Sequence, residues 1–326
     1  MPTHRQPVEL GILIYPQAQL AAVHGLTDLF AVASRQAAAR ADTVAELRVV
    51  HWQAAPDGTG VRRGDDSHPG PPGRPAALIL PPSLGELPDR AVAGRLAEWL
   101  KGWHAEGAVL CSVCAGAFLL AETGLLAGRA ATTHWSLAER LARRHPEIRV
   151  DADKLLLDDG DLVTAGGLMA WTDLGLRLVD RLLGSAVMLA TARFLLVDPP
   201  GREQRCYSSF APRLHHGDAA VLKVQHWLQA QGARQVSLSA MAARAGLEER
   251  TFQRRFRKAT GLRPTEYCQH LRVGRARELL ELTRDSVERI AWAVGYEDSG
   301  AFRKVFARVT GLPPGDYRRR FGIAAA

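Results

Sequence analysis

Two cysteines stand three residues apart where an apolar run changes character. The stretch AVLCSVCAGAFLLAETGLL, residues 108–126, places Cys111 in a strand-like run and Cys114 before a helix-like one. A thiol at such a turn, followed by the small residues Ala115 and Gly116, can stand above the carboxyl edge of a sheet, where open α/β folds bind ligands. The positive end of the helix is expected to lower the thiol pKa. Cys114 could therefore be a ligand-pocket residue, a nucleophile, a thiol switch or packing.

Other residues could act with this thiol. His134, in ATTHW, could orient or deprotonate it. Trp171 and Asp173, in MAWTDLGL, open a helix-like stretch; the tryptophan could stack on a ligand or fill the core, and the aspartate could cap the helix or face the pocket. A structural zinc site needs four ligands, and Cys111 and Cys114 have no second pair, so we predict no metal and no other cofactor. Cys111 fits the strand pattern and is expected to pack.

The elements that must position these residues alternate along the chain. Short apolar runs read as buried strands and are separated by stretches with helical spacing. This order predicts an α/β domain of flavodoxin-like type, with a mostly parallel sheet and helices on both faces. Residues 55–75 are rich in Gly, Pro and Asp and predict a surface loop or excursion, and residues 174–198 predict one closing helix. The predicted strands are residues 8–15, 46–52, 76–82, 108–113 and 162–167.

Length and composition set the broad class. With 326 residues, the chain exceeds the usual size of one domain, and its 47% hydrophobic and 23% charged residues are typical of a globular protein. No apolar run approaches the roughly 20 residues of a membrane span, and the start lacks the apolar region of a secretory signal. The 4 cysteines do not form the pattern of a disulfide framework. We therefore expect a cytoplasmic protein that does not enter a membrane.

Positive charge is concentrated in the last third of the chain. From Asp218 onward there are 20 Lys and Arg against 11 Asp and Glu, whereas the residues before it carry 22 against 23. A partner that attracts positive charge should therefore meet the C-terminal part. A polyanion such as a nucleic acid is the expected partner.

This basic part contains an internal repeat. The pattern of residues 238–247 recurs at 287–296, 49 residues later, and each copy is followed by a Phe-x-x-x-Phe pair and by TGLRPTEY or TGLPPGDY. A short helix, a glycine turn and a second helix anchored by two Phe residues describe a helix-turn-helix, whose second helix can enter a major groove of DNA. Residues 266–282 read as a helix that connects the two copies.

Residues 218–321 resemble the DNA-binding domain of AraC/XylS-type transcription regulators over its full two-motif length. The resemblance implies that two recognition helices enter successive major-groove segments of double-stranded promoter DNA. The second helix carries the small residues Ser299, Gly300 and Ala301, so we expect the first motif to supply more sequence discrimination. By position, the DNA-binding residues are Arg250, Gln253, Arg254 and Arg257 in the first motif and Ser299, Arg303 and Lys304 in the second.

Roughly residues 8–195 resemble the DJ-1/PfpI superfamily. The resemblance rests on GILIYP, the cysteine elbow, ATTHW and DGDLVTAGGLMAWTDLGLRLV, and it is closest to the amidase-like sensor domains that precede AraC-type domains in GlxA-type regulators. In catalytic relatives the cysteine and histidine work with a carboxylate just after the first strand. This chain has only Gln17 and Gln19 there, and no acid before Asp28, so we predict a sensor and not an enzyme.

The sequence thus predicts a DNA-binding transcription regulator, with activation favoured over repression. Its domains would be 1–198, a ligand-sensing domain; 199–217, a linker; and 218–326, the DNA-binding domain. The resemblance implies a homodimer, a contact with RNA polymerase and a small nitrogenous metabolite as effector. The alternatives are an amidase or glyoxalase-like enzyme tethered to DNA and a thiol-based redox regulator. The predicted ligand-binding residues are Cys114, Ala115, Gly116, His134, Trp171 and Asp173, and none is predicted to be catalytic.

Overall fold

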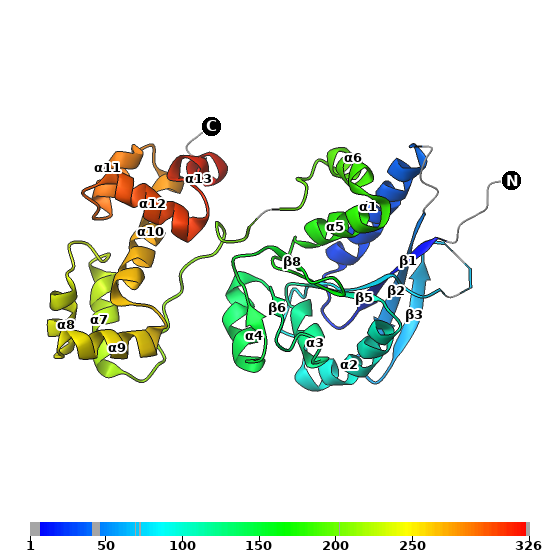
Figure 1. The fold of residues 1–326 in the computed structure, drawn as a ribbon, viewed down its shortest axis with the longest axis horizontal. Helices are drawn as coiled ribbons and strands as arrows, with labels where there is room; N and C mark the ends of the chain where they lie inside the picture. Colours follow the sequence, from blue (N-terminus) through cyan, green and yellow to red (C-terminus); the bar gives the residue numbers. More distant parts are fainter. Residues whose placement is uncertain (1–6, 41–45, 69, 72, 202, 324–326) are drawn as a thin grey trace. The chain divides into compact units, whose positions relative to one another are not determined.

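A computed structural model shows a chain of two compact units, Met1–Gln204 and Arg205–Ala326 (Figure 1). Each unit has its own hydrophobic cores. The structure describes residues 7–40, 46–68, 70–71, 73–201 and 203–323.

The N-terminal unit alternates strands and helices. Its strands are β1 Val8–Ile14, β2 Leu47–Ala54, β3 Val61–Asp66, β4 Ala77–Leu80, β5 Val109–Val113, β6 Ala130–Ala131, β7 Arg149–Val150, β8 Leu156–Asp158 and β9 Leu162–Ala165. Its helices are α1 Leu20–Ala38, α2 Arg90–Ala105, α3 Gly116–Glu122, the 3-10 turn η1 Trp135–Leu137, α4 Ala138–Arg144, α5 Trp171–Leu183 and α6 Ser185–Leu195.

Seven of these strands form one sheet in the order β3-β2-β1-β4-β5-β9-β8. The five apolar runs predicted as strands become β2, β1, β4, β5 and β9, all mutually parallel, and β3 and β8 are antiparallel edges. One core lies between the sheet and α1, α5 and α6, and the other lies between the sheet and α2, α3 and α4. The predicted flavodoxin-like α/β fold is therefore confirmed.

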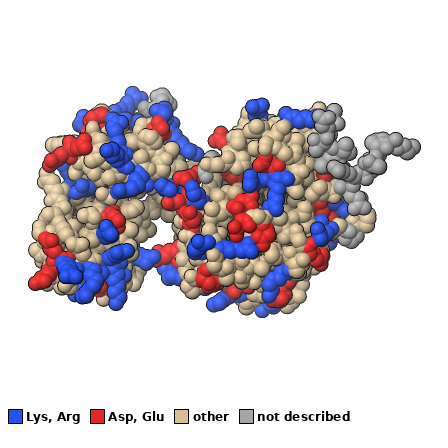
Figure 2. Space-filling model, in the orientation of Figure 1, with Lys and Arg blue, Asp and Glu red and all other residues tan. Residues whose placement is uncertain are grey.

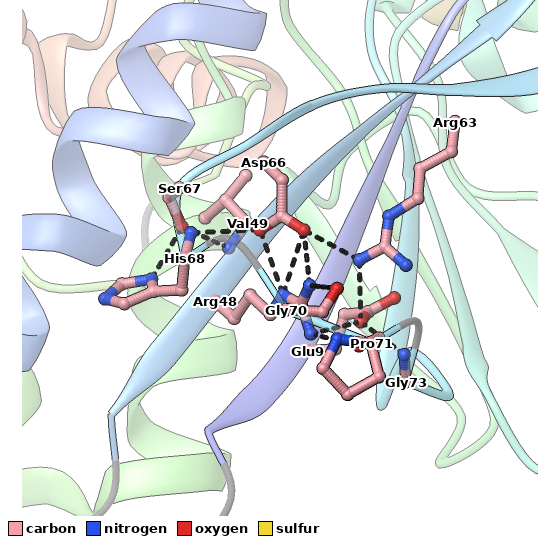
Figure 3. A network of polar contacts seen from close by, with 10 residues as sticks. All are labelled: Glu9, Arg48, Val49, Arg63, Asp66, Ser67, His68, Gly70, Pro71 and Gly73. Atoms are coloured by element: carbon pink, nitrogen blue, oxygen red, sulfur yellow. Dashed lines mark hydrogen bonds and ion pairs between the residues drawn. The ribbon is translucent and has the colours of Figure 1, made fainter.

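The prediction that residues 55–75 form only a surface loop is wrong, because they contain β3. A polar network holds β3 to its neighbours, and Figure 3 shows Arg48 of β2 between the carboxylates of Asp66 and Glu9. The Arg48 Nε donates to Asp66 Oδ1 at 2.9 Å, and Arg63 donates to Asp66 Oδ2 at 2.8 Å. The two guanidinium groups hold the pKa of Asp66 at about 2. These long-range ion pairs replace the apolar pattern that a strand usually shows.

The prediction of a single helix over residues 174–198 is also wrong. The chain forms α5 and α6, which meet at Gly184 with a φ of 89°. Only glycine adopts this conformation at little cost, so the helix breaks there.

The residues predicted as a linker pack on the two units. Gln204 is buried in the N-terminal unit. In the C-terminal unit, Arg277 donates to the carbonyl oxygens of Cys206 and Ser208, and the Phe210 ring stacks on His270. The boundary between the two units therefore lies between Gln204 and Arg205, within the predicted linker.

The regular elements in the described part of the C-terminal unit are all helices. One core forms among α7, α8, α9 and the first half of α10, and a second forms among the rest of α10, α11, α12 and α13. Helix α10 contributes Tyr267 to the first core and Leu280 to the second, so it holds two modules together (Figure 1). The helices are α7 Ala219–Ala230, α8 Leu238–Ala245, α9 Glu249–Thr260, α10 Pro264–Leu282, α11 Val287–Ala293, α12 Ser299–Thr310 and α13 Pro314–Phe321.

The repeat in the sequence is a repeat of contacts. In each module the two Phe side chains of the second helix are fully buried: Phe252 and Phe256 in α9, Phe302 and Phe306 in α12. A threonine ends each second helix by donating to the carbonyl of its last buried Phe, at 2.8 Å in α9 and 2.9 Å in α12. Two helix-turn-helix modules follow one another, as predicted.

Candidate functional site

Cys114 lies at a sharp turn between β5 and α3. Its φ of 53° is in the left-handed region, which is unusual for a residue with a side chain, and its N–H donates to Ala165 O at 2.8 Å. Gly116 is required two residues later, because a Cβ there would lie 2.4 Å from the carbonyl oxygen of Leu80. The predicted elbow is therefore present, and it is held against β4 and β9.

The prediction that the helix lowers the Cys114 pKa is wrong. The residue is only 3% exposed, and burial raises the pKa of its thiol to about 11. The backbone N–H groups of Ala115 and His134 favour the thiolate, but they do not offset the burial. Cys114 is thus a neutral thiol near pH 7, which is a poor nucleophile. Cys111 is fully buried in the core of the sheet, and burial raises its thiol pKa too.

We expect alkylation of Cys114 in the native protein to be slow at pH 8 and to accelerate about tenfold per pH unit up to pH 10.5. The rate follows the thiolate fraction, which keeps rising until the pKa of about 11 is reached. Iodoacetamide labelling, located by tandem mass spectrometry, measures it. Glutathione is the control, because its ordinary thiol pKa makes its rate level off near pH 9. A Cys114 rate that also levels off near pH 9 would contradict the raised pKa.

The His134 ring caps the 3-10 turn η1 that follows it. Its Nδ1 lies 2.7 Å from Ser136 Oγ and accepts from the Ser136 N–H at 3.2 Å, so the side chain caps η1. A neutral ring that accepts at Nδ1 carries its proton on Nε2 and has no free lone pair for the thiol proton. Burial also lowers the pKa of His134. What acts on the Cys114 thiol is the backbone N–H of His134.

The carboxyl ends of β1 and β4 meet beside this elbow. In the sheet, β2 lies on one side of β1 and β4 lies on the other, so the direction of strand addition reverses between β1 and β4. Open α/β sheets bind ligands at the carboxyl ends of the strands at such a reversal, so a ligand crevice is expected between β1 and β4. Tyr15, just after β1, donates its hydroxyl proton to Pro81 O at 2.6 Å, and its pKa is raised by burial and by the nearby Cys114. Gln19 is buried, and its Oε1 has no hydrogen-bond partner among the described residues. The stretch GILIYP contains Tyr15, but nothing local in the sequence indicates its hydrogen bond to Pro81.

Trp171 and Asp173 lie in the first turn of α5. Trp171 packs tightly on α1, since a Cβ at Gly25 would lie 2.5 Å from its ring. Its Nε1 is buried and has no partner among the residues that the structure describes. Asp173 is buried and is not the cap of the helix, because α5 begins at Trp171 and its N-cap is Ala170. The Thr172 hydroxyl donates to Asp173 Oδ2 at 3.3 Å.

Gln204, missed by the sequence analysis, ties the elbow to the end of the N-terminal unit. It is 2% exposed, and its Nε2 lies 2.8 Å from Thr133 O and 3.0 Å from Lys154 O, while its Oε1 accepts from the Trp135 N–H at 3.1 Å. Thr133 in turn donates its hydroxyl proton to Cys114 O at 2.7 Å. A continuous set of hydrogen bonds therefore runs from the elbow to the last residue of this unit.

In the C-terminal unit, a basic face follows α9. Lys and Arg side chains gather over this helix (Figure 2). Its exposed side chains at Arg250, Gln253, Arg254 and Arg257 have no recorded hydrogen bond or ion pair in the described part of the chain. Arg255 differs, because its guanidinium binds both carboxylate oxygens of Asp218 at 2.8 and 2.9 Å and fixes α9 to the start of α7. The helix thus keeps one arginine for structure and leaves the others available.

The corresponding face of α12 has fewer basic side chains, and one of them is held in an ion pair. Arg303 donates to Glu288 of α11, and Lys304 is exposed. Ser299 opens the helix, and the Asp298 carboxylate caps it by accepting from the Gly300 N–H at 2.8 Å. The structure therefore gives the second module fewer available polar groups than the first.

Neither a metal site nor a membrane-spanning helix is found among the residues that the structure describes. No group of three or more His, Cys, Asp and Glu side chains there could hold a metal ion. The helices in the same part of the chain are too short or too polar to span a membrane.

Two separate parts of the chain match known protein families. Residues 74–181 match the DJ-1/PfpI family, and residues 241–320 match a helix-turn-helix domain family. A solved AraC family transcriptional regulator from Pseudomonas putida is 19% identical, covers 58% of this chain and 100% of its own, and superposes with a TM-score of 0.45.

Two curated relatives are similar over more than 60% of the chain. The HTH-type transcriptional regulator GlxA of Rhizobium meliloti (strain 1021) is 31% identical over 213 residues, which are 64% of this chain and 65% of that protein, just under two thirds. The HTH-type transcriptional regulator CdhR of Pseudomonas aeruginosa is 28% identical over 71% of this chain and 69% of its own length. The chain therefore joins a domain of the DJ-1/PfpI family to an AraC-type helix-turn-helix domain, as its sequence predicts.

Proposed function

We propose that this chain is a transcription regulator that binds double-stranded promoter DNA through α9 and α12 and responds to a small molecule bound in its N-terminal unit. The observation that carries the proposal is the face of α9, where arginine and amide groups stand exposed on a helix fixed by Arg255 and Asp218. Arg and Gln can read guanine and adenine edges, and flanking arginines neutralise phosphates.

Arg254→Ala should weaken binding to a specific duplex by about 1–3 kcal/mol and relax the preference at one base pair. The reason is the loss of a bidentate contact that only a free guanidinium can make. The measurement is a fluorescence-anisotropy titration with a duplex that the wild-type chain selects from a random library. Arg193→Ala, at an exposed position of α6, is the matched control and removes the same charge. Equal losses for both variants would contradict a base contact by Arg254.

The effector half of the proposal rests on the elbow. A neutral Cys114 thiol and a His134 ring without a free lone pair support binding and not catalysis. The proposed pocket residues are Cys114, Ala115, Gly116, His134, Trp171 and Asp173. The buried Gln19 Oε1 supplies an acceptor for an N–H donor, which suits a small nitrogenous effector. A metabolite that binds there should slow the alkylation of Cys114.

Regulation would follow from unequal affinity. The effector must bind the DNA-competent arrangement more tightly than the other arrangement, since equal affinity shifts no population. The proposal includes a homodimer on paired sites, a contact with RNA polymerase, activation of transcription and a cytoplasmic location. These rest on the roles of similar regulators.

A further inference from the structure

The two helix-turn-helix modules differ at one pair of positions. The repeat aligns Ser239 of α8 with Glu288 of α11, and Gln253 of α9 with Arg303 of α12. In the first module both residues are neutral; in the second they are oppositely charged. The buried Phe, Thr and Tyr residues make equivalent contacts in both modules, so the two modules share the same packing and differ in charge at this pair of positions.

The charged pair of the second module is engaged. The Arg303 guanidinium donates to Glu288 Oε1, across the turn between α11 and α12. In the first module the Ser239 hydroxyl instead pairs with Ser237 Oγ at 2.9 Å, and the Gln253 amide has no recorded partner among the described residues. The same position of the recognition helix is therefore free in one module and held in the other.

The surroundings of Arg303 strengthen this difference. Both side chains of the pair keep water contact, with 48% of Arg303 and 59% of Glu288 exposed. Glu297 and the capping carboxylate of Asp298 add negative charge at the start of α12. A phosphate or guanine edge must compete with the Glu288 carboxylate for Arg303 and must approach three acidic groups.

We propose that Glu288 limits the contribution of the second module to DNA recognition by holding Arg303. The proposal rests on the proposed function, because it assumes that α12 meets DNA. An exposed ion pair is a weak interaction, so the restraint reduces the affinity for DNA by about two- to fivefold. Glu288 is thus a positioning residue that acts through Arg303.

The test copies the first module into the second in the full chain. Glu288→Ser should bind the duplex selected by the wild-type chain about two- to fivefold more tightly. If the freed Arg303 reaches a phosphate, the dependence of log Kd on log salt should also steepen by about one. Glu297→Ser is the matched control, since it removes the same charge from an exposed residue of this module that has no recorded contact with Arg303.

A second background separates the restraint from simple charge. With Arg303→Ala present, Glu288→Ser should give no larger gain than Glu297→Ser. A gain that persists without Arg303, or one that Glu297→Ser reproduces in the wild-type background, would overturn the proposal. A wild-type chain that selects no duplex would contradict the proposed function itself, and this inference with it.

Discussion

Replacing Gly116 with alanine should lower the free energy of unfolding of the N-terminal unit by roughly 3 kcal/mol. A Cβ at this position would lie 2.4 Å from Leu80 O and 2.9 Å from Pro81 O. These are backbone oxygens that cannot rotate away, so the elbow or β4 must move. The higher helix propensity of alanine recovers only about 1 kcal/mol. Calorimetry of the full chain should show the N-terminal transition roughly 6–12 °C lower.

Gly167→Ala is the matched control for Gly116→Ala. It adds the same methyl group just after β9, where nothing lies within 4 Å of the new Cβ. Its effect should stay within about 0.5 kcal/mol. Equal melting temperatures for the two variants would mean that the elbow does not pack against β4 as described. Alkylation of Cys114 gives a second reading, because a displaced elbow exposes the thiol.

The central strands were predictable because burial marks them in the sequence. A parallel strand covered on both faces is mostly apolar, and VELGILI and VLCSV carry that signal without any knowledge of their neighbours. The edge strand β3, VRRGDD, carries no such signal. It depends on Arg48 and Glu9, which lie in other strands, and no local window of sequence contains that network.

The helix break and the thiol pKa show the same limit. Residues 174–198 are rich in apolar positions with helical spacing, and that spacing does not reveal that Gly184 adopts a φ of 89°. For Cys114, the local signal of a helix start predicted a lowered pKa. Burial by segments distant in the sequence reversed the direction. The distant segments, and not the elbow itself, decide the chemistry of the thiol.

The two helix-turn-helix modules were easier to predict, because their signals are local. A glycine turn and a Phe pair define each module within about 25 residues, and both Phe pairs are fully buried as expected. The restraint of Arg303 by Glu288 was not predicted. It depends on the angle between α11 and α12, which no spacing in the sequence gives.

Gln204→Ala should lower the free energy of unfolding of the N-terminal unit by about 2–4 kcal/mol. The variant leaves the Trp135 N–H and the carbonyl oxygens of Thr133 and Lys154 without the side chain that they contact, and a buried polar group that loses its partner costs about 1–3 kcal/mol. The rate of hydrogen exchange should increase most at the Trp135 amide, since that N–H donates directly to Gln204. Calorimetry of the full chain measures the global loss.

Gln36→Ala is the control for Gln204→Ala. Gln36 is half-buried in α1 and has no recorded side-chain hydrogen bond among the described residues, so this variant should change the free energy of unfolding by less than about 0.5 kcal/mol. Unchanged exchange at Trp135 in Gln204→Ala would show that water replaces the carboxamide at no cost. Because Arg205 already belongs to the other unit, a released Gln204 lengthens the free chain between the two units. The hydrogen bonds that reach Cys114 through Thr133 end at this residue, so its release would uncouple the elbow from the chain that leads to the C-terminal unit.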